Sequence, residues 1–175
     1  VGMLGSVRDG DAVRNASGSL VLTGGGDLSG PSDAGTFVWQ TLSGDGQVVA
    51  RVTSLDQAGS DSRAGIMIRD SLTPKSAHAF LGINGGGDFR WIHRARTGAP
   101  SKQRKIGKGS PPATWVKLVR DGDKVTALKS RDGEEWTRVG SATVDLGKNC
   151  YIGLMVSGGG NKQAIASFRD VRIKP

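Results

Sequence analysis

The sequence predicts an all-β fold, built as an antiparallel sandwich of two sheets. Short segments of alternating apolar and polar residues recur along the chain, with turn-forming residues about every 8 to 12 positions. None of the 175 residues lies in a sustained 3.6-residue apolar period, and 28 are glycine. We expect one domain over 1–175, excised from a larger multidomain protein because the chain opens at Val1 without an initiator Met.

Six strands are expected in the first part of the chain. SLVLTG precedes a glycine run, TFVWQTL and QVVARVTSL are joined by the hairpin-type turn SGDG, and RAGIMIRDS alternates regularly. SAHAFLGIN and DFRWIHRAR follow, joined by three glycines. These strands occupy 19–24, 36–42, 47–55, 63–71, 76–84 and 88–96.

Five more strands follow a basic segment that we interpret as a mobile loop. Their sequences are TWVKLVR, KVTALKSR, EWTRVGSATV, CYIGLMVSG and QAIASFRDVRI, at 114–120, 124–131, 135–144, 150–158 and 163–173. SRDGEEW at 130–136 has the form of an Asp-box, in which Asp132 caps a turn, Gly133 permits positive φ and Trp136 packs beneath. We expect this motif to be structural, and the lone Cys150 to be a buried apolar side chain.

Strand alternation assigns faces. In 63–71, Ala64, Ile66 and Ile68 share one face, while Met67 and Arg69 share the other. In 88–96, one face carries Phe89, Trp91 and His93. We expect the other face to be solvent-exposed, with Arg90, Ile92, Arg94 and Arg96.

The chain's positive charge comes from one segment. Residues 89–120 hold nine of the 24 Lys and Arg residues and none of the 16 acids, and the whole chain carries a formal charge of +8. Aromatic side chains are interleaved with these cations. Cations beside aromatic rings suit an anionic ligand that also has an apolar face.

A sugar polymer with acidic groups fits these residues. Sugar rings stack on aromatic faces, and carboxylate or sulfate groups accept charge-assisted hydrogen bonds from Arg and Lys. Residues of 88–96 and of the following segment form the centre of the predicted site. Arg51 and Arg69 extend it if their strands are sheet neighbours, and His78 is expected to donate to a sugar hydroxyl. The candidate ligand-binding residues are Arg51, Arg69, His78, Arg90, Trp91, His93, Arg94, Arg96, Lys102, Arg104 and Lys105. A second interpretation stays open, in which the basic segment is a solvated sheet edge and Trp91 is core.

The sequence holds no catalytic or phosphate-binding signature. Glycosidic hydrolysis usually needs two carboxylates about 5 to 10 Å apart, and the acids here lie mainly in turns. His78 and His93 lack metal-ligand spacing, and no glycine run is followed by the Lys-Ser or Lys-Thr of a phosphate loop. No apolar run approaches the roughly 18 residues of a membrane span, and we expect no signal peptide in the first residues, which lack a basic and then apolar pattern.

The order of segments resembles a known family. The segments that carry this resemblance are GDG-x-VVARV (44–52), AGIMIRDSL (64–72), HAFLGI (78–83), WVKLVRDGDKVTALKSRDGEEWTRVGS (115–141), YIGLMVSG (151–158) and ASFRDVRI (166–173). In this order they are similar to the DUF1349 family of concanavalin A-like, laminin G-like jelly-roll domains in bacterial exported proteins. The resemblance implies an ancillary, often glycan-binding module that is secreted or held in the cell envelope. It also implies a possible structural calcium ion, with Asp27, Asp33 and Asp170 as candidate ligands.

Three function classes follow. The first is a noncatalytic module that binds an anionic, sulfated or uronic polysaccharide; the second is a structural or protein-interaction sandwich without a glycan site; the third is a glycoside-processing enzyme. The sequence pI of 10.1 permits nonspecific polyanion binding, but no specific nucleic-acid motif is present. We expect the first class.

Overall fold

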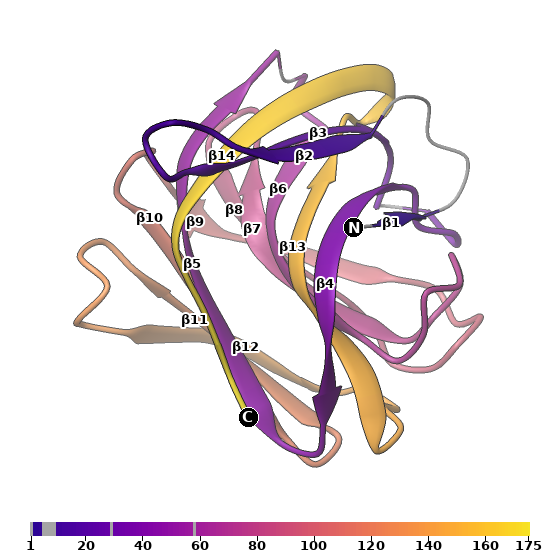
Figure 1. Cartoon of the computed structure of the whole chain (residues 1–175). Helices are drawn as coiled ribbons and strands as arrows, with labels where there is room; N and C mark the ends of the chain where they lie inside the picture. Colours follow the sequence, from indigo (N-terminus) through magenta and orange to yellow (C-terminus); the bar gives the residue numbers. More distant parts are fainter. Residues whose placement is uncertain (1, 5–9, 29, 58) are drawn as a thin grey trace.

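The protein is a two-layer sandwich of antiparallel strands, as the sequence predicts. A computed structural model describes residues 2–4, 10–28, 30–57 and 59–175, and no helix occurs in these ranges. Sheet A has the order β1 (Gly2–Leu4), β4 (Gly35–Ser43), β13 (Asn149–Ser157), β6 (Arg63–Arg69), β7 (His78–Asn84), β8 (Asp88–Arg94) and β9 (Lys102–Lys108). Sheet B has the order β12 (Thr137–Thr143), β11 (Lys124–Ser130), β10 (Thr114–Asp121), β5 (Gly46–Asp56), β14 (Gly160–Lys174), β3 (Leu20–Gly26) and β2 (Asp11–Arg14) (Figure 1).

The main core lies between the two sheets. Alternate residues of the central strands point into it, such as Ile66 and Ile68 from sheet A and Val116 and Phe168 from sheet B. Cys150 also belongs to this cluster, which confirms the interpretation of its side chain as a buried one. Burial raises the pKa of the Cys150 thiol, although Arg120 opposes this effect. The thiol is therefore protonated at neutral pH.

A second apolar cluster covers the outer face of sheet A. Met67 and Phe80 alternate with core residues on β6 and β7, and they pack with Leu28 from the β3–β4 connection. Both faces of these strands are therefore buried, and β6 and β7 are buried at every position. The predicted face assignment of 63–71 is confirmed, because Ile66 and Met67 belong to different clusters.

The expectation that Ile92 and Arg94 face solvent is wrong. Ile92 belongs to the cluster on the outer face of sheet A, and Arg94 is completely buried. The reason is that segments outside the strands cover this face. The amide of Asp33 donates to the carbonyl of Pro74 at 2.8 Å, and the amide of Gly98 donates to Lys75 at 2.8 Å, so three connections form one layer.

The basic segment contains a strand and not only a loop. Lys102–Lys108 forms β9, which pairs with β8 through register partners such as Trp91 with Arg104 and His93 with Lys102. Every residue of β9 except Ile106 is exposed, because β9 is the terminal strand of sheet A. An edge strand that is exposed on both faces lacks the alternation by which the other strands are predicted. The expectation of a mobile loop at 102–108 is therefore wrong.

The inter-sheet core depends on large side chains from the centre of sheet B. Phe168 of β14 is 0% exposed and lies between Leu20 and Val52 in register. We expect Phe168→Ala to lower the free energy of unfolding by about 3 to 5 kcal/mol, through lost transfer energy and a residual cavity. Urea denaturation followed by tryptophan fluorescence measures this change.

The matched control is Val13→Ala, because the Val13 side chain on β2 is 50% exposed. Its expected effect is within about 0.5 kcal/mol. Equal effects of the two substitutions would contradict the assigned core.

Candidate functional site

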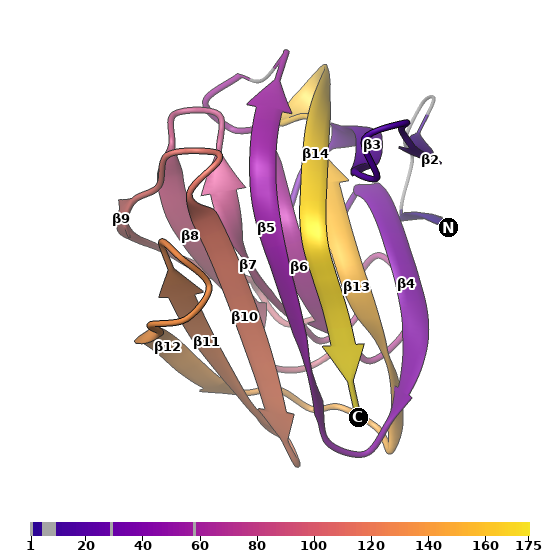
Figure 2. The ribbon, with the colours of Figure 1, turned by 60° about the vertical axis from the view of Figure 1, so that its left-hand side comes forward.

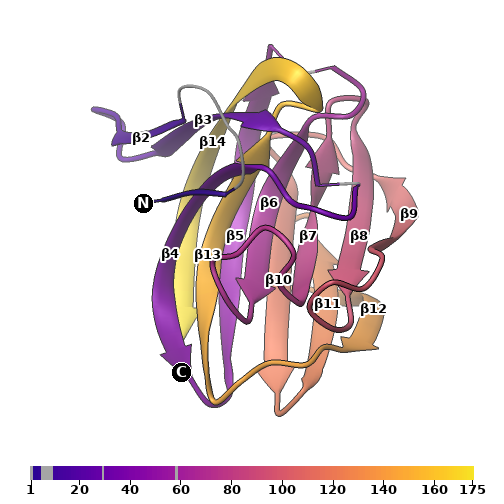
Figure 3. The same cartoon turned by 90° about the vertical axis from the view of Figure 1, so that its right-hand side faces the viewer.

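Two pockets open along the edge of the sandwich at which β9 and β12 lie. β9 ends sheet A and β12 ends sheet B. Figures 2 and 3 show both strands on the same side of the molecule, opposite to β2 and the N-terminus. Side chains of both sheets therefore reach the solvent at this edge.

The first pocket, called the Trp91 pocket, has a volume of about 300 Å³. Four of its residues are among the candidate ligand-binding residues from the sequence, and no Asp or Glu lines it. Cationic and neutral polar groups therefore surround an aromatic floor. The lining residues are Trp91, His93, Lys102, Gln103, Arg104 and Ser141.

Trp91 and His93 lie on the inward face of β8. Their ring centroids are 5.5 Å apart, with the planes inclined by 32°. Trp91 is only 3% exposed, so it is a floor and not an open platform. A Cβ atom at Gly140 would lie 2.9 Å from Trp91 Nε1, so the glycine leaves room for the indole.

His93 supplies a titratable group to the pocket. Burial lowers the pKa of the imidazole, and the nearby charges of Lys102, His78 and Arg104 lower it further. The ring is therefore mainly neutral at pH 7. Its Nδ1 is buried without a hydrogen-bond partner among the described residues, so this nitrogen does not face the solvent in the pocket.

A β-bulge in β12 sets the shape of the pocket wall. Gly140 pairs with Ala127 and Arg138 with Leu128, so Val139 is an extra residue in the ladder. Val139 packs against the core, and its carbonyl accepts a 2.6 Å hydrogen bond from Arg104 of β9. Arg104 thus ties the two sheet edges together beside Trp91.

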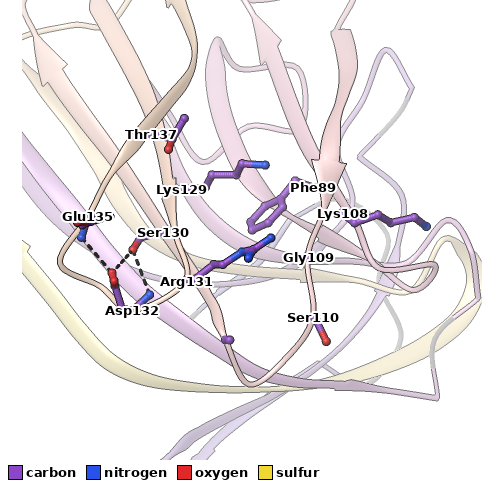
Figure 4. Close-up of a pocket in the computed structure, with 11 residues that line it drawn as sticks. Phe89, Lys108, Gly109, Ser110, Lys129, Ser130, Arg131, Asp132, Glu135 and Thr137 are labelled. Carbon is purple, nitrogen blue, oxygen red and sulfur yellow. Dashed lines mark hydrogen bonds between the residues drawn. The ribbon is translucent and has the colours of Figure 1, made fainter.

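The second pocket, called the Phe89 pocket, has a volume of about 530 Å³ (Figure 4). Lys129 Nζ lies 4.8 Å from the centre of the Phe89 ring and donates a 3.0 Å hydrogen bond to the carbonyl of Ile106. This lysine is a second tie between the sheet edges. The lining residues are Phe89, Lys108, Gly109, Ser110, Ala113, Lys129, Ser130, Arg131, Asp132, Glu135 and Thr137.

The Asp-box turn forms one wall of the Phe89 pocket, and its expected geometry is confirmed. Asp132 Oδ1 accepts hydrogen bonds from the amides of Glu134 and Glu135 at 2.8 and 3.0 Å, and Gly133 has a φ of 84°. These hydrogen bonds hold the pKa of Asp132 at about 2. The packing differs in one respect, because the ring nearest to Gly133 is Trp115.

Asp88 neutralises part of the positive charge of β9. It comes directly before the acid-free segment, and its Oδ1 lies 3.0 Å from Lys105 Nζ and 2.8 Å from Lys108 Nζ. Hydrogen bonds from Lys108 and Lys105 hold the pKa of Asp88 at about 2. Lys102 and Arg104, at the other end of β9, have no ion pair with a described residue. The excess charge therefore lies beside the Trp91 pocket.

Arg94 forms a buried ion pair with Asp33. Arg94 Nη1 and Nη2 each lie 2.9 Å from an oxygen of the Asp33 carboxylate, and both side chains are 0% exposed. The guanidinium also donates to backbone carbonyl oxygens of all three covering connections. These carbonyls belong to Gly30, Pro74, Ser76 and Ala99.

Arg69 and His78 complete this buried cluster. Arg69 Nη2 lies 3.4 Å and His78 Nδ1 3.2 Å from Asp33 Oδ2. Burial lowers the pKa of Arg69 to about 10, so the guanidinium remains charged at neutral pH. Arg69, His78 and Arg94 are thus joined to one another, but they form an enclosed anchor for the connections and present no surface to a ligand.

The remaining predicted residues lie apart from the Trp91 pocket. Arg51 is on β5 of sheet B, where it stacks over Trp115 and donates to the carbonyl of Pro112 at 2.7 Å, so it does not extend the face of β8. Arg90 is half-buried beside Asp88 at 3.8 Å. Arg96 is exposed beyond the end of β8, and Lys105 is exposed on β9.

The calcium candidates do not form one site. The oxygens of Asp33 face two arginines, which disfavours a cation. Asp170 lies 3.9 Å from Arg51 on the strand β14. In the described ranges no three His, Cys, Asp or Glu residues gather as metal ligands, and the described residues include no helix suited to cross a membrane.

Sequence reasoning missed several residues at this edge. Gln103 and Ser141 line the Trp91 pocket, and Lys129 links β11 to β9. Gln103 lies within the basic segment, so a strand predicted over this segment would have put Gln103 beside β8 and the Trp91 pocket. Ser141 and Lys129 carry no such signal, because they reach the pockets only through the apposition of the two sheets.

Solved structures share this fold. A functionally unknown protein from Saccharomyces cerevisiae superposes with a TM-score of 0.74 at 15% identity, over 94% of this chain and 95% of that one. The carbohydrate-binding module CBM66 from Bacillus subtilis superposes with a TM-score of 0.63 at 15% identity, over 97% and 94%. A β-glucanase from Bacillus licheniformis gives 0.60 at 11% identity, over 94% and 82%.

These likenesses define the class of the fold: a two-sheet jelly-roll sandwich, which occurs both in a carbohydrate-binding module and in a glycan-cleaving enzyme. No protein-family model matches the chain, and no curated protein matches it. The narrower resemblance to the DUF1349 family therefore stays a prediction.

The buried Asp33 carboxylate is expected to be essential for stability. Asp33→Asn leaves Arg69 and Arg94 without a counter-charge, so we expect a loss of about 3 to 5 kcal/mol in the free energy of unfolding, measured by urea denaturation at pH 7. Exposed Asp121→Asn is the control, with an effect within about 0.5 kcal/mol.

The pH dependence of this loss has a defined sign. Burial alone would raise the pKa of Asp33, but His78, Arg94 and Arg69 outweigh it, so the pKa lies below 3.8. The stability from the carboxylate is therefore present above pH 3.8 and is lost as the pH falls through the lowered folded-state pKa. A difference between wild type and Asp33→Asn that grows on acidification would contradict this assignment.

Proposed function

We propose that the chain is a noncatalytic carbohydrate-binding module that recognises an anionic polysaccharide at the Trp91 pocket. One observation carries the proposal: His93, Lys102 and Arg104 surround a pocket floored by an indole and lined by no acid. The fold likeness to a carbohydrate-binding module supports the class. The anionic preference is inferred from the pocket chemistry alone.

The pocket offers each group that an acidic sugar requires. The guanidinium of Arg104 and the ammonium of Lys102 donate to a carboxylate or sulfate. Gln103 and Ser141 supply neutral donors and acceptors for sugar hydroxyls. The part of the Trp91 ring that lines the pocket provides an apolar contact for the C–H face of the sugar.

The acids near the edge support binding without bond cleavage. Only Asp132 and Glu135 line the described pockets as carboxylates. Asp132 is held by the turn with a pKa of about 2, so it does not serve as the protonated acid that glycosidic hydrolysis needs. One remaining carboxylate does not make the usual pair.

In this role the module would belong to a longer exported chain, secreted or in the cell envelope, and would hold a neighbouring domain against its polysaccharide. A rigid sheet edge suits this role, because a preformed site loses little conformational entropy on binding. Nucleic acids would bind only as nonspecific polyanions, with a steep dependence on salt.

Titration calorimetry with charged and neutral glycans tests this proposal. Polygalacturonate and a sulfated glycan are the charged probes, and an uncharged β-glucan is the neutral one. We expect binding of the charged probes, weakened by salt, and weaker binding of the neutral glucan. Absence of binding to all three would leave a structural or protein-interaction sandwich instead.

Removal of a pocket cation is expected to weaken glycan binding. Lys102→Ala and Arg104→Ala should each raise the Kd for the preferred charged glycan about tenfold, which corresponds to roughly 1.4 kcal/mol. Arg96→Ala is the matched control, because Arg96 carries the same charge, is exposed and lines neither pocket.

The control should change the Kd by less than about twofold, because salt screens distant exposed charges. Thermal denaturation checks that Arg104→Ala stays folded after losing its hydrogen bond to Val139. If Arg96→Ala weakens binding as much as Lys102→Ala, the ligand senses only the net charge.

Binding is expected to tighten as the pH falls. The pKa of His93 is lowered in the free protein, and a bound anion favours the imidazolium and raises this pKa. Affinity for a sulfated glycan, whose charge stays constant, should therefore rise as the pH falls through the raised bound-state pKa and level off below the lowered free-state pKa. Calorimetry across this range on wild type and His93→Gln measures the effect, and an unchanged pH profile in the variant contradicts it.

A further inference from the structure

The Trp91 and Phe89 pockets form two successive parts of one binding edge. Phe89 and Trp91 lie two positions apart on the same face of β8. On the opposite sheet, Thr137 lines the Phe89 pocket and Ser141 lines the Trp91 pocket. Thr137 and Ser141 pair with Lys129 and Thr126 of β11, which are three strand positions apart. Three strand positions correspond to about 10 Å, so both pockets lie within reach of one short oligosaccharide.

Two ties separate the pockets. Arg104 donates to the carbonyl of Val139 at 2.6 Å, and Lys129 donates to the carbonyl of Ile106 at 3.0 Å. Each tie joins β9 of sheet A to the edge of sheet B. A ligand that occupies both pockets therefore passes over these ties as an extended chain and does not enter one deep cavity.

The two pockets differ in charge. The Trp91 pocket has cations and no acid, whereas the Phe89 pocket has Asp132 and Glu135 beside its cations. Lys108 is already paired with Asp88, so Asp132 and Glu135 balance the two remaining cations, Lys129 and Arg131. An acidic sugar in the Phe89 pocket would therefore gain no net attraction, and it would be repelled wherever its carboxylate lies beside Glu135.

A neutral sugar with polar groups fits the Phe89 pocket better than an acidic sugar does. Ser110 and Thr137 present hydroxyls, and the exposed side chains of Arg131 and Glu135 can donate to and accept from sugar hydroxyls or an amide. Figure 4 shows Arg131 extending from the Asp-box turn toward Phe89. The wall therefore favours a neutral sugar unit with several hydrogen-bonding groups.

We infer that the ligand is an extended polysaccharide in which acidic and neutral sugars alternate, an inference that rests on the proposed function. An acidic unit would occupy the Trp91 pocket, and a neutral unit would occupy the Phe89 pocket. Recognition then depends on internal units of the polymer, and its affinity grows with length until both pockets are filled.

An oligosaccharide series tests this inference by calorimetry. The probes are hyaluronan oligomers, which alternate glucuronate and N-acetylglucosamine, and oligogalacturonates, which are acidic at every unit, from disaccharide to octasaccharide. We expect the hyaluronan series to gain about tenfold in affinity with length, as two linked contacts replace one. The oligogalacturonates should gain less.

Variants at the Phe89 pocket separate the two parts of the site. Glu135→Ala combined with Thr137→Val should remove the gain with length for hyaluronan and leave disaccharide binding unchanged. Glu135→Lys should raise the affinity of the longer oligogalacturonates, because it replaces the repelling charge. Arg138→Ala is the matched control, since Arg138 is exposed on β12 and lines neither pocket.

The outcomes distinguish this inference from the proposed function. Binding that depends on Lys102 but shows no gain with length, or an equal gain for both polymers, overturns the two-pocket inference and leaves the proposed function intact. If the protein binds neither oligosaccharide series nor the sulfated glycan, both the two-pocket inference and the proposed function are wrong.

Discussion

The ion pair between Asp33 and Arg94 holds the connections that close the outer face of β6, β7 and β8. A guanidinium that is 0% exposed must find hydrogen-bond acceptors inside the protein. Arg94 finds them in the Asp33 carboxylate and in carbonyls of three connections, which close the outer face of sheet A. The outer face of β6, β7 and most of β8 thus becomes part of the interior, whereas β9 at the edge of sheet A stays exposed.

That edge combines the opposing requirements of a binding site. The sheets must stay together where no strand pairing joins them, and the space between them must stay partly open. Arg104 and Lys129 meet both requirements, since each carries a charge to the edge and also donates to a carbonyl of the facing sheet. The same side chains that hold the edge together therefore make it attractive to anions.

The sequence predicts the fold better than the site because strand patterns are local and pockets are not. The eleven segments recognised by alternation all contain strands, whereas β1, β2 and β9 are not predicted. β1 and β2 span only three and four residues, and KQRKIGK of β9 is exposed on both faces. Alternation correctly places Trp91 and His93 on one face of β8, but it cannot show that Asp33, 61 residues earlier in the chain, buries Arg94. Ser141 enters the Trp91 pocket only through the packing of the two sheets.

The extra residue in β12 has a consequence for evolution. The bulge brings Gly140 against the indole of Trp91 and Val139 to Arg104, so the depth of the Trp91 pocket depends on a single inserted position. Loss of one codon would restore a regular ladder, and a side chain at 140 would collide with the ring. One insertion or deletion at this position of β12 can therefore open or close the Trp91 pocket, while the pairing of the other strands stays in place.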